Sequence, residues 1–108
     1  QTIGLFETPR GEKPVEEFIK SQERKLRAKI VHEIDLLERF GPQLREPHSK
    51  KVQKGLWELR IRGETEIRIL YTFIDKTILL LHAFKKKGQK IPSKEMNIAS
   101  DRMARLKK

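Results

Sequence analysis

The chain has 108 residues, of which 36% are hydrophobic and 37% are charged, and 25 basic against 15 acidic residues give a formal net charge of +10. This length predicts one domain over residues 1–108 with one modest core. The positive charge makes a polyanion such as RNA or DNA, an anionic membrane face or an acidic protein the expected partner. The absence of cysteine excludes disulfides, thiolate catalysis and zinc sites built on cysteine.

No apolar run approaches the ~18 residues of a membrane-spanning segment, and the longest is "TILLLHAF". The first residues show no charged and then apolar leader segment. The lack of cysteine fits a reducing compartment. We therefore expect a soluble, cytoplasmic protein that is not embedded in a membrane.

The N-terminal part of the chain predicts a short strand and two helices. A β-rich run over residues 2–7 stops at a cluster of turn formers. Pro14 suits the first turn of one helix, and Ser21 could cap a second helix that ends at Gly41 and Pro42. Apolar side chains recur every three or four residues, as expected of helices that lay one stripe on a sheet. This stripe consists of Val15, Phe18, Ile19, Leu26, Ile30, Ile34 and Leu37.

Three strands and a last helix are predicted after an irregular basic connection over residues 41–55. Residues 56–62 and 67–73 alternate apolar and polar side chains around a turn, and residues 77–84 are apolar almost throughout, as in a central strand covered on both faces. A helix follows Pro92. The predicted fold class is α+β: a small antiparallel sheet with two N-terminal helices packed on one face and a C-terminal helix.

Two arginines face each other in the predicted hairpin. A turn at residues 63–65 sets Arg60 opposite Arg68, and like charges directly opposite each other destabilise a sheet. A two-residue turn at residues 75–76 would add Ala83 and Lys85 to the same face. This cluster could bind an anion, because guanidinium groups match phosphate oxygens two at a time. It could equally be an ordinary ion network in which the arginines pair with Glu58, Glu64 and Glu66.

The remaining candidate residues give weaker signals. His32 is expected on a helix surface, and His82 as a hydrogen-bonded core residue, whereas His48 in the basic connection is the freest to reach a ligand. Trp57 and Tyr71 are expected to be neighbouring core aromatics rather than stacking partners for bases. No metal-ligand spacing, phosphate-binding glycine loop or nucleophilic triad is present.

Several stretches resemble the RelE/ParE superfamily of type II toxins, and most closely its phage-derived Gp49-like, HigB-like branch. They are "ETPRGEKPVEEFI", "GLWELRIR", "RILYTF" and "LLLHAFKKKGQKIPSKEMNIA", which occur in the family's order over nearly the whole chain. The resemblance implies a ribosome-dependent mRNA endonuclease that needs no metal or cofactor. In this chemistry the RNA 2′-hydroxyl attacks the adjacent phosphate. The implied partners are the ribosome, mRNA and a helix-turn-helix antitoxin that neutralises the toxin.

The resemblance also assigns catalytic residues. Arg68 matches the family's arginine that contacts the scissile phosphate, Arg60 a basic position on the preceding strand, and Lys85 and Lys86 the basic exit from the last strand. The repulsion between Arg60 and Arg68 would then be relieved only when a phosphate lies between them, and Arg68→Ala would abolish toxicity without affecting the fold. Further RNA and ribosome contacts are expected from His48, Lys50, Lys51, Lys54, Arg62, Lys87 and Lys90.

The chain departs from the family pattern in one respect. Related toxins often carry a tyrosine or histidine near the C-terminal end of the sheet as acid or base, and "KKGQKIPSKEMN" offers neither. Glu58, His48 or a lysine with a lowered pKa could transfer the proton, and these alternatives stay open. Two other functions also stay open: a ParE-like gyrase poison that hydrolyses nothing, and an inactive regulator paired with an antitoxin.

Overall fold

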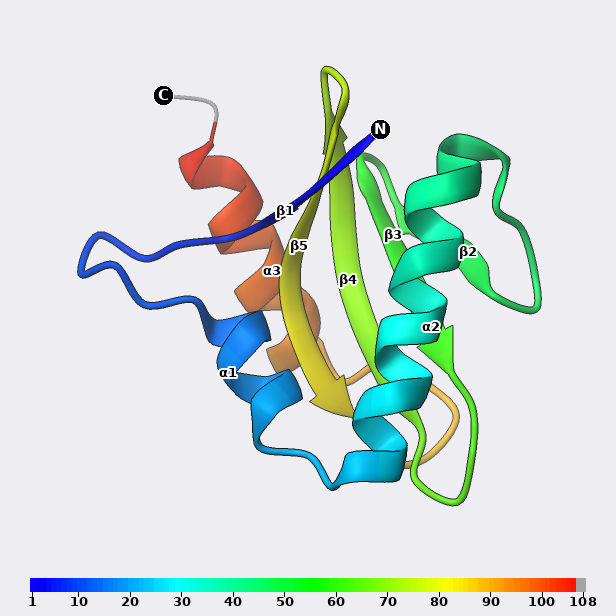
Figure 1. The fold of residues 1–108 in the computed structure, drawn as a ribbon. Coiled ribbons are helices and arrows are strands. Elements are labelled where there is room, and N and C mark those ends of the chain that lie inside the picture. Colours follow the sequence, from blue (N-terminus) through cyan, green and yellow to red (C-terminus); the bar gives the residue numbers. More distant parts are fainter. Residues whose placement is uncertain (107–108) are drawn as a thin grey trace.

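The computed structural model describes residues 1–106 and consists of a five-stranded sheet with helices on both faces (Figure 1). This arrangement confirms the predicted α+β class. The elements in chain order are β1 (Thr2–Leu5), α1 (Pro14–Lys20), α2 (Arg24–Phe40), the short 3-10 helix η1 (Gly41–Gln43), β2 (Ser49–Gln53), β3 (Leu56–Ile61), β4 (Ile67–Ile74), β5 (Thr77–Lys85) and α3 (Ser93–Arg105).

The strands lie in the order β1-β5-β4-β3-β2. All neighbours are antiparallel except β1 and β5, which are parallel, so the sheet is not purely antiparallel as predicted. Strand β2 was not predicted either, and the sequence had indicated an irregular connection there. Its residues are mostly polar or charged, as is common on an edge strand, and so they lack the apolar alternation that marks a strand in sequence.

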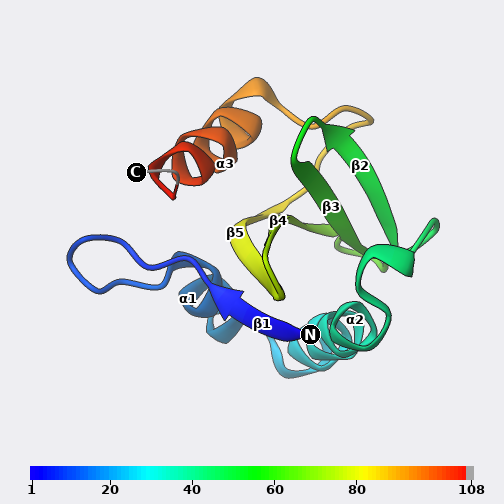
Figure 2. The ribbon, with the colours of Figure 1, turned by 90° about the horizontal axis from the view of Figure 1, so that it is seen from above.

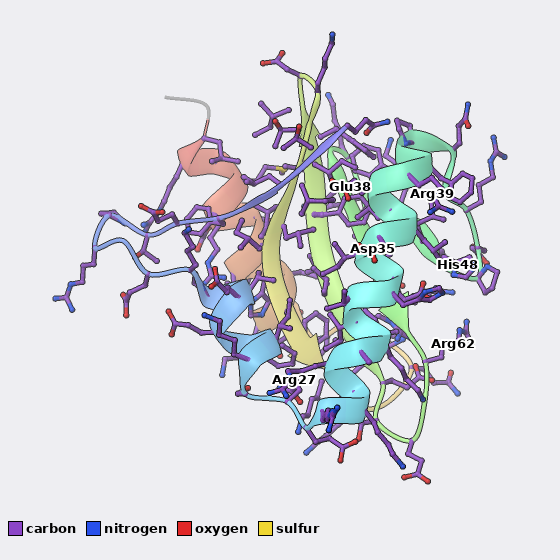
Figure 3. All side chains as sticks on the ribbon, viewed as in Figure 1. Arg27, Asp35, Glu38, Arg39, His48 and Arg62 are labelled. Carbon is purple, nitrogen blue, oxygen red and sulfur yellow. The ribbon has the colours of Figure 1, made fainter. Side chains whose placement is uncertain are left out.

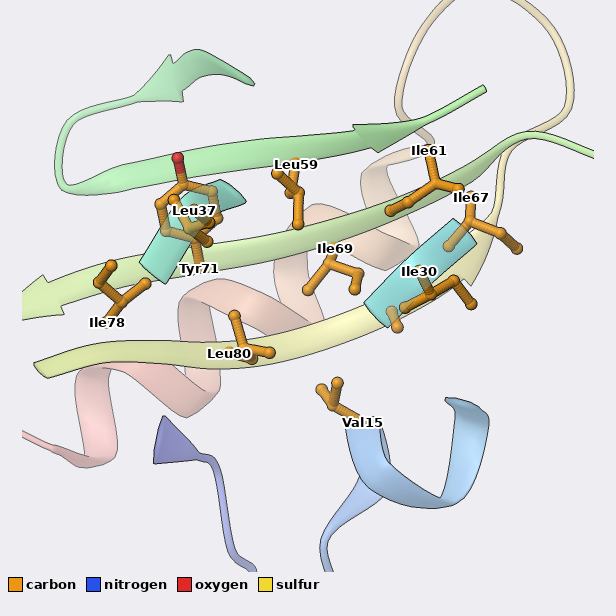
Figure 4. Packing of buried hydrophobic residues seen from close by; sticks show 11 residues of the cluster. Val15, Ile30, Leu37, Leu59, Ile61, Ile67, Ile69, Tyr71, Ile78 and Leu80 are labelled. Carbon is orange, nitrogen blue, oxygen red and sulfur yellow. The ribbon is translucent and has the colours of Figure 1, made fainter. Parts of the chain in front are cut away.

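Each face of the sheet has its own hydrophobic core. Helices α1 and α2 cover one face and α3 covers the other, as the view from above shows (Figure 2). The larger core, between the sheet and α1 and α2, is shown in Figure 4 and consists of Val15, Ile30, Leu37, Leu59, Ile61, Ile67, Ile69, Tyr71, Ile78, Leu80 and Ala83. The smaller core under α3 consists of Phe6, Leu56, Leu70, Leu81, Phe84 and Ala99.

The two aromatic residues singled out in the sequence belong to the larger core, as predicted. Tyr71 is 1% exposed, and the half-buried Trp57 packs against the same core. Their ring centroids lie 6.3 Å apart in a stacked arrangement. The ammonium of Lys51 lies 5.6 Å from the centre of the Trp57 ring.

A β-bulge in β5 changes which side chains share a face. The pairing of Ile74 with Thr77 agrees with the expected turn at residues 75–76, but the register shifts between Leu70 and Tyr71 of β4. Leu81 is therefore an extra residue, and beyond it Ala83 and Lys85 alternate onto the α1 and α2 face. The prediction that these two residues share a face with Arg68 was wrong. A continuous apolar strand gives no alternation from which such a shift could be read.

Candidate functional site

Arg60 and Arg68 lie directly opposite each other, as the hairpin register predicted. The same register pairs Ile61 with Ile67 and Trp57 with Tyr71. The apolar residues on either side of Arg60 and Arg68 in their strands belong to the core under α1 and α2. Because successive side chains of a strand point to opposite faces, the two arginines lie on the α3 face. Period-two alternation was therefore enough to place the arginine pair.

Carboxylates already hold both guanidinium groups. Nε of Arg60 donates to Oε1 of Glu58 at 2.8 Å, and Nη2 of Arg68 donates to Oε1 of Glu66 at 2.7 Å. Arg68 is only 4% exposed, and its Nη1 donates to the carbonyl oxygen of Ile67 at 3.2 Å. The expectation that only a phosphate relieves the repulsion was wrong. The ion network that the residue types had left open as the alternative is present.

One carboxylate links the two arginines. Glu58 is 2% exposed, and its Oε2 lies 3.5 Å from Nε of Arg68. Over residues 1–106 these two buried atoms have no hydrogen-bond partner. The hydrogen bond from Arg68 lowers the pKa of Glu66. The ion pairs therefore neutralise most of the charge in the network. One carboxylate oxygen and one N–H group stay buried at its centre without a hydrogen bond.

Glu58 and Arg60 border a cavity of about 350 Å³ that we name the basic groove. Its walls come from β2, β3, the segment after β5 and the first turns of α3. Five cationic residues and one carboxylate line it, and Lys50 lies directly across from Glu58 on the neighbouring strand. The lining consists of Lys50, Lys51, Val52, Glu58, Arg60, Lys86, Gln89, Lys90, Ile91 and Met96. The groove has a local excess of positive charge that the buried network does not neutralise.

The predicted catalytic residues do not all meet in this groove. Arg60 and Lys86 line it, whereas Arg68 lies beneath it and is absent from its lining. Lys85 faces away from it, into a cavity of about 750 Å³ between the start of α2 and the turn over residues 63–65. Lys85, the last residue of β5, and Lys86, the residue after it, therefore line different cavities and are not placed to act on one phosphate as a pair.

The residues expected to contact RNA and the ribosome are also divided. Lys50, Lys51 and Lys90 line the basic groove. Lys54 is exposed in the turn between β2 and β3, and Lys87 is exposed after β5. Lys51 borders the groove from the edge strand, but its ammonium lies beside the Trp57 ring, on the side of the larger core. The other four lysines are exposed, where an extended polyanion could reach them.

His48 and Arg62 lie beside α2 instead (Figure 3). Nδ1 of His48 is 2.9 Å from Oε1 of Glu33 on α2, so this histidine is not free to reach the groove. Arg62 is exposed and borders a shallow cavity with His32 and Glu33. Sequence reasoning did not find the contact with Glu33, because this partner is remote in sequence, and the His48 side chain keeps 41% of its surface exposed.

The other histidines take the positions expected of them. His32 is exposed on α2. His82 is partly buried beside the smaller core, with Nε2 at 2.7 Å from Oε1 of Glu95 and its ring stacked on Phe84. Burial lowers the pKa of His82, and the hydrogen bond with Glu95 offsets part of this effect. Nη1 of Arg102 donates at 2.7 Å to the carbonyl of Leu81, the bulge residue.

The sequence missed the apolar wall of the groove. Ile91 and Met96 lie on it beside Gln89, and they precede or begin α3. Only the isolated apolar residues Ile91 and Met96 in the otherwise basic and polar segment after Phe84 could have indicated that this segment folds back over the sheet. Within residues 1–106, no three His, Asp or Glu side chains are grouped to hold a metal ion, and no helix is long and apolar enough to cross a membrane.

The fold and the groove define a small α+β domain with a strongly basic surface on one face of its sheet. Residues 17–104 match the family described as phage derived protein Gp49-like (DUF891). The match covers most of the chain, so the protein belongs to the Gp49-like family, which is a toxin-like family. Comparison with curated proteins found no significant match.

Proposed function

We propose that this Gp49-like protein is the toxin of a type II toxin-antitoxin system and acts as a ribosome-dependent mRNA endonuclease. The observation that supports this function best is the basic groove, in which Lys50, Arg60, Lys86 and Lys90 line the same cavity as a single carboxylate. A phosphodiester backbone is the ligand that such a charge distribution favours. The similarity of the chain to a toxin-like family supports the same function.

Cleavage by the 2′-hydroxyl builds negative charge on the phosphorus centre, and fixed cations directed at that charge lower the barrier. Arg60 on β3, Lys50 on β2 and Lys86 just after β5 line the groove together with the carboxylate. Arg60 can exchange Glu58 for a phosphate because its side chain keeps 15% of its surface exposed. Arg68 has a different role from the one that the resemblance implied. It holds Glu58 and Glu66 in place from below and does not contact the substrate.

The proposed partners are the ribosome, mRNA and a helix-turn-helix antitoxin, in the cytoplasm. Exposed cations outside the groove would contact ribosomal RNA, and Lys54, Lys87 and Arg62 are exposed as this role requires. Lys90 at the groove margin would hold a phosphate that flanks the cleavage site, and Lys51, whose ammonium lies beside Trp57, would contact RNA at the edge of the sheet. His48 is not assigned to RNA, because Glu33 holds it against α2.

One observation favours a second candidate function. Both central guanidinium groups are paired with carboxylates without a ligand, as in a structural ion network. A toxin that binds its target without cleaving it, as a ParE-like gyrase poison does, requires no free catalytic arginine. An inactive regulator that acts only with an antitoxin would also tolerate this network.

Mapping of nucleic-acid ends after induction in cells distinguishes these functions. We expect new RNA 5′ ends inside translated codons, with growth arrest and intact DNA. The double variant Lys50→Ala/Lys86→Ala should lose these ends. The control Lys13→Ala/Lys76→Ala removes the same charge from exposed positions remote from the groove and should behave as the unmodified protein. Growth arrest with intact messages and gyrase-dependent DNA breaks would reject the endonuclease and support the second candidate.

A further inference from the structure

We propose that a pocket beside the end of α2, which we name the aromatic pocket, docks one apolar side chain of an acidic protein partner. It is a cavity of about 340 Å³ lined by Gly41, Pro42, Leu44, Trp57, Tyr71 and Phe73. It lies on the side of the larger core and shares no lining residue with the basic groove. The inference therefore concerns a separate interaction surface and does not depend on the endonuclease function.

Three aromatic rings form one wall of the aromatic pocket. The ring centroids of Trp57 and Phe73 lie 4.8 Å apart edge to face, and those of Tyr71 and Phe73 lie 5.6 Å apart. The other wall comes from residues 41–44, where Gly41 ends α2 with a φ of 52°. Because α2 ends there, the helix does not continue over the rings, and Trp57 and Phe73 stay half-buried.

Large apolar side chains stay exposed next to the lining residues in sequence. Phe40, which precedes Gly41, is 44% exposed, and Ile74, which follows Phe73, is 38% exposed. Apolar patches on the surface of a protein often mark binding sites, and tryptophan and tyrosine are enriched among the residues that dominate protein interfaces. The pocket volume is near the lower end of the ~300–1,000 Å³ range of ligand pockets, so it suits one aromatic or branched side chain.

The charges around the aromatic pocket favour an acidic partner. The ammonium of Lys51 lies 5.6 Å from the centre of the Trp57 ring, and no carboxylate of residues 1–106 forms an ion pair with it. No charged residue from this part of the chain lines the pocket itself. The net charge of +10 also attracts an acidic surface over longer distances. A partner carboxylate would therefore pair with Lys51 while the neighbouring apolar side chain packs on Trp57.

Two other occupants fit the pocket less well. A second copy of the chain would bring together two proteins that each carry a net charge of +10 and repel each other. An RNA strand would meet one cation here, whereas the basic groove offers it Lys50, Arg60, Lys86 and Lys90. An acidic protein segment with an apolar side chain satisfies both the aromatic lining and the ammonium beside it.

Fluorescence of Trp57 tests the inference, because this residue is the only tryptophan of the chain. The probe is a blocked heptapeptide with a central phenylalanine flanked on each side by three glutamates. Its binding should shift the emission to shorter wavelength, with a dissociation constant below about 1 mM. An alanine in place of the phenylalanine should weaken binding at least about tenfold, because the burial of a large apolar side chain is lost. A peptide with lysines in place of the glutamates should not bind.

Variants of exposed residues locate the binding site without disturbing the core. Pro42→Glu places a negative charge at the pocket and should weaken binding of the phenylalanine peptide at least about fivefold, whereas Pro42→Lys should strengthen it. Lys51→Gln should weaken binding about two- to fivefold, which is the effect of one exposed ion pair. Lys13→Gln removes the same charge elsewhere and should have less effect. Val31→Glu, at an apolar residue of α2 that is 50% exposed outside the pocket, should leave the affinity unchanged.

Four results would overturn the inference. One is the absence of any emission shift with the phenylalanine peptide up to about 1 mM. Another is equal binding of the phenylalanine and alanine peptides, or equal losses for Pro42→Glu and Val31→Glu, because either would show only a general attraction between opposite charges. A shift with single-stranded RNA but not with the peptide would make the pocket a base-binding site. A shift that depends on protein concentration alone would show that a second copy covers the pocket.

Discussion

Arg60 lies directly across from Arg68 in the β3–β4 pair, and carboxylates rather than a bound anion hold the two like charges together. The arginine pair is therefore part of the folded framework. Its charge is largely neutralised at the centre by Glu58 and Glu66. We therefore expect anions to bind further out, at Arg60 and at the lysines of the basic groove. This division between a buried network and a cationic rim leads to the following predictions.

Lys86 and Lys85 should differ in RNA binding although they are adjacent. Lys86→Ala removes a groove cation, so the slope of log affinity for single-stranded RNA against log salt should fall by about 0.7, the value for one lost phosphate contact. Lys85→Ala is the matched control on the opposite face and should leave the slope unchanged. Filter binding over a range of salt concentrations measures both. Equal losses would contradict the separation of the two lysines by the strand.

Arg68→Ala should destabilise the fold. The sequence had suggested that this variant loses activity alone, but a residue that is 4% exposed and holds a buried carboxylate changes that expectation. Removing one partner of a buried ion pair costs about 3–5 kcal/mol. Urea denaturation should show this loss, whereas the exposed Arg62→Ala should stay within about 0.5 kcal/mol of wild type. Wild-type stability for Arg68→Ala would show that the network contributes little.

Stability should fall in mild acid because of His82. Burial lowers its pKa in the folded state, so the unfolded chain binds a proton more readily. The stabilising contribution is present above about pH 6.5 and is lost as the pH falls toward the lower pKa of the folded state. The groups that face the ring are Glu95 and Arg102, with Lys94 nearby. Thermal unfolding of His82→Gln should show a weaker pH dependence, whereas the exposed His32→Gln should keep the wild-type dependence.

A hydroxyl pair should stabilise the junction of β2 with the sheet. The hydroxyl groups of Ser49 and Tyr71 are buried and hydrogen-bonded to each other. Tyr71→Phe leaves the Ser49 hydroxyl without its partner and should cost about 1–3 kcal/mol. The double variant with Ser49→Ala should cost less than the sum of the single variants, and a double-mutant cycle measures the difference. Strict additivity would show that the two hydroxyls are not coupled.

The elements and the arginine register followed from local patterns. Alternation over residues 56–73 placed Arg60 opposite Arg68 on the α3 face, and helical spacing identified the faces of α1 and α2 that are buried. Strand β2 was missed because its residues are mostly polar or charged and show no apolar alternation, and an edge strand needs few apolar residues. The correct predictions and the missed strand β2 have the same cause. Alternation of polar and apolar residues indicates which side chains are buried, but it does not indicate which backbone groups are hydrogen-bonded.

The sequence by itself determined the fold class, the family likeness, the excess of positive charge and the shared face of two arginines. Only the tertiary structure decided which cations meet. The bulge at Leu81 sends Lys85 to one face, and the return of the chain into α3 brings Lys86 and Lys90 to the groove on the other. It also decided that Glu58 neutralises the arginines, because side-chain partners depend on packing between strands and leave no trace in residue spacing.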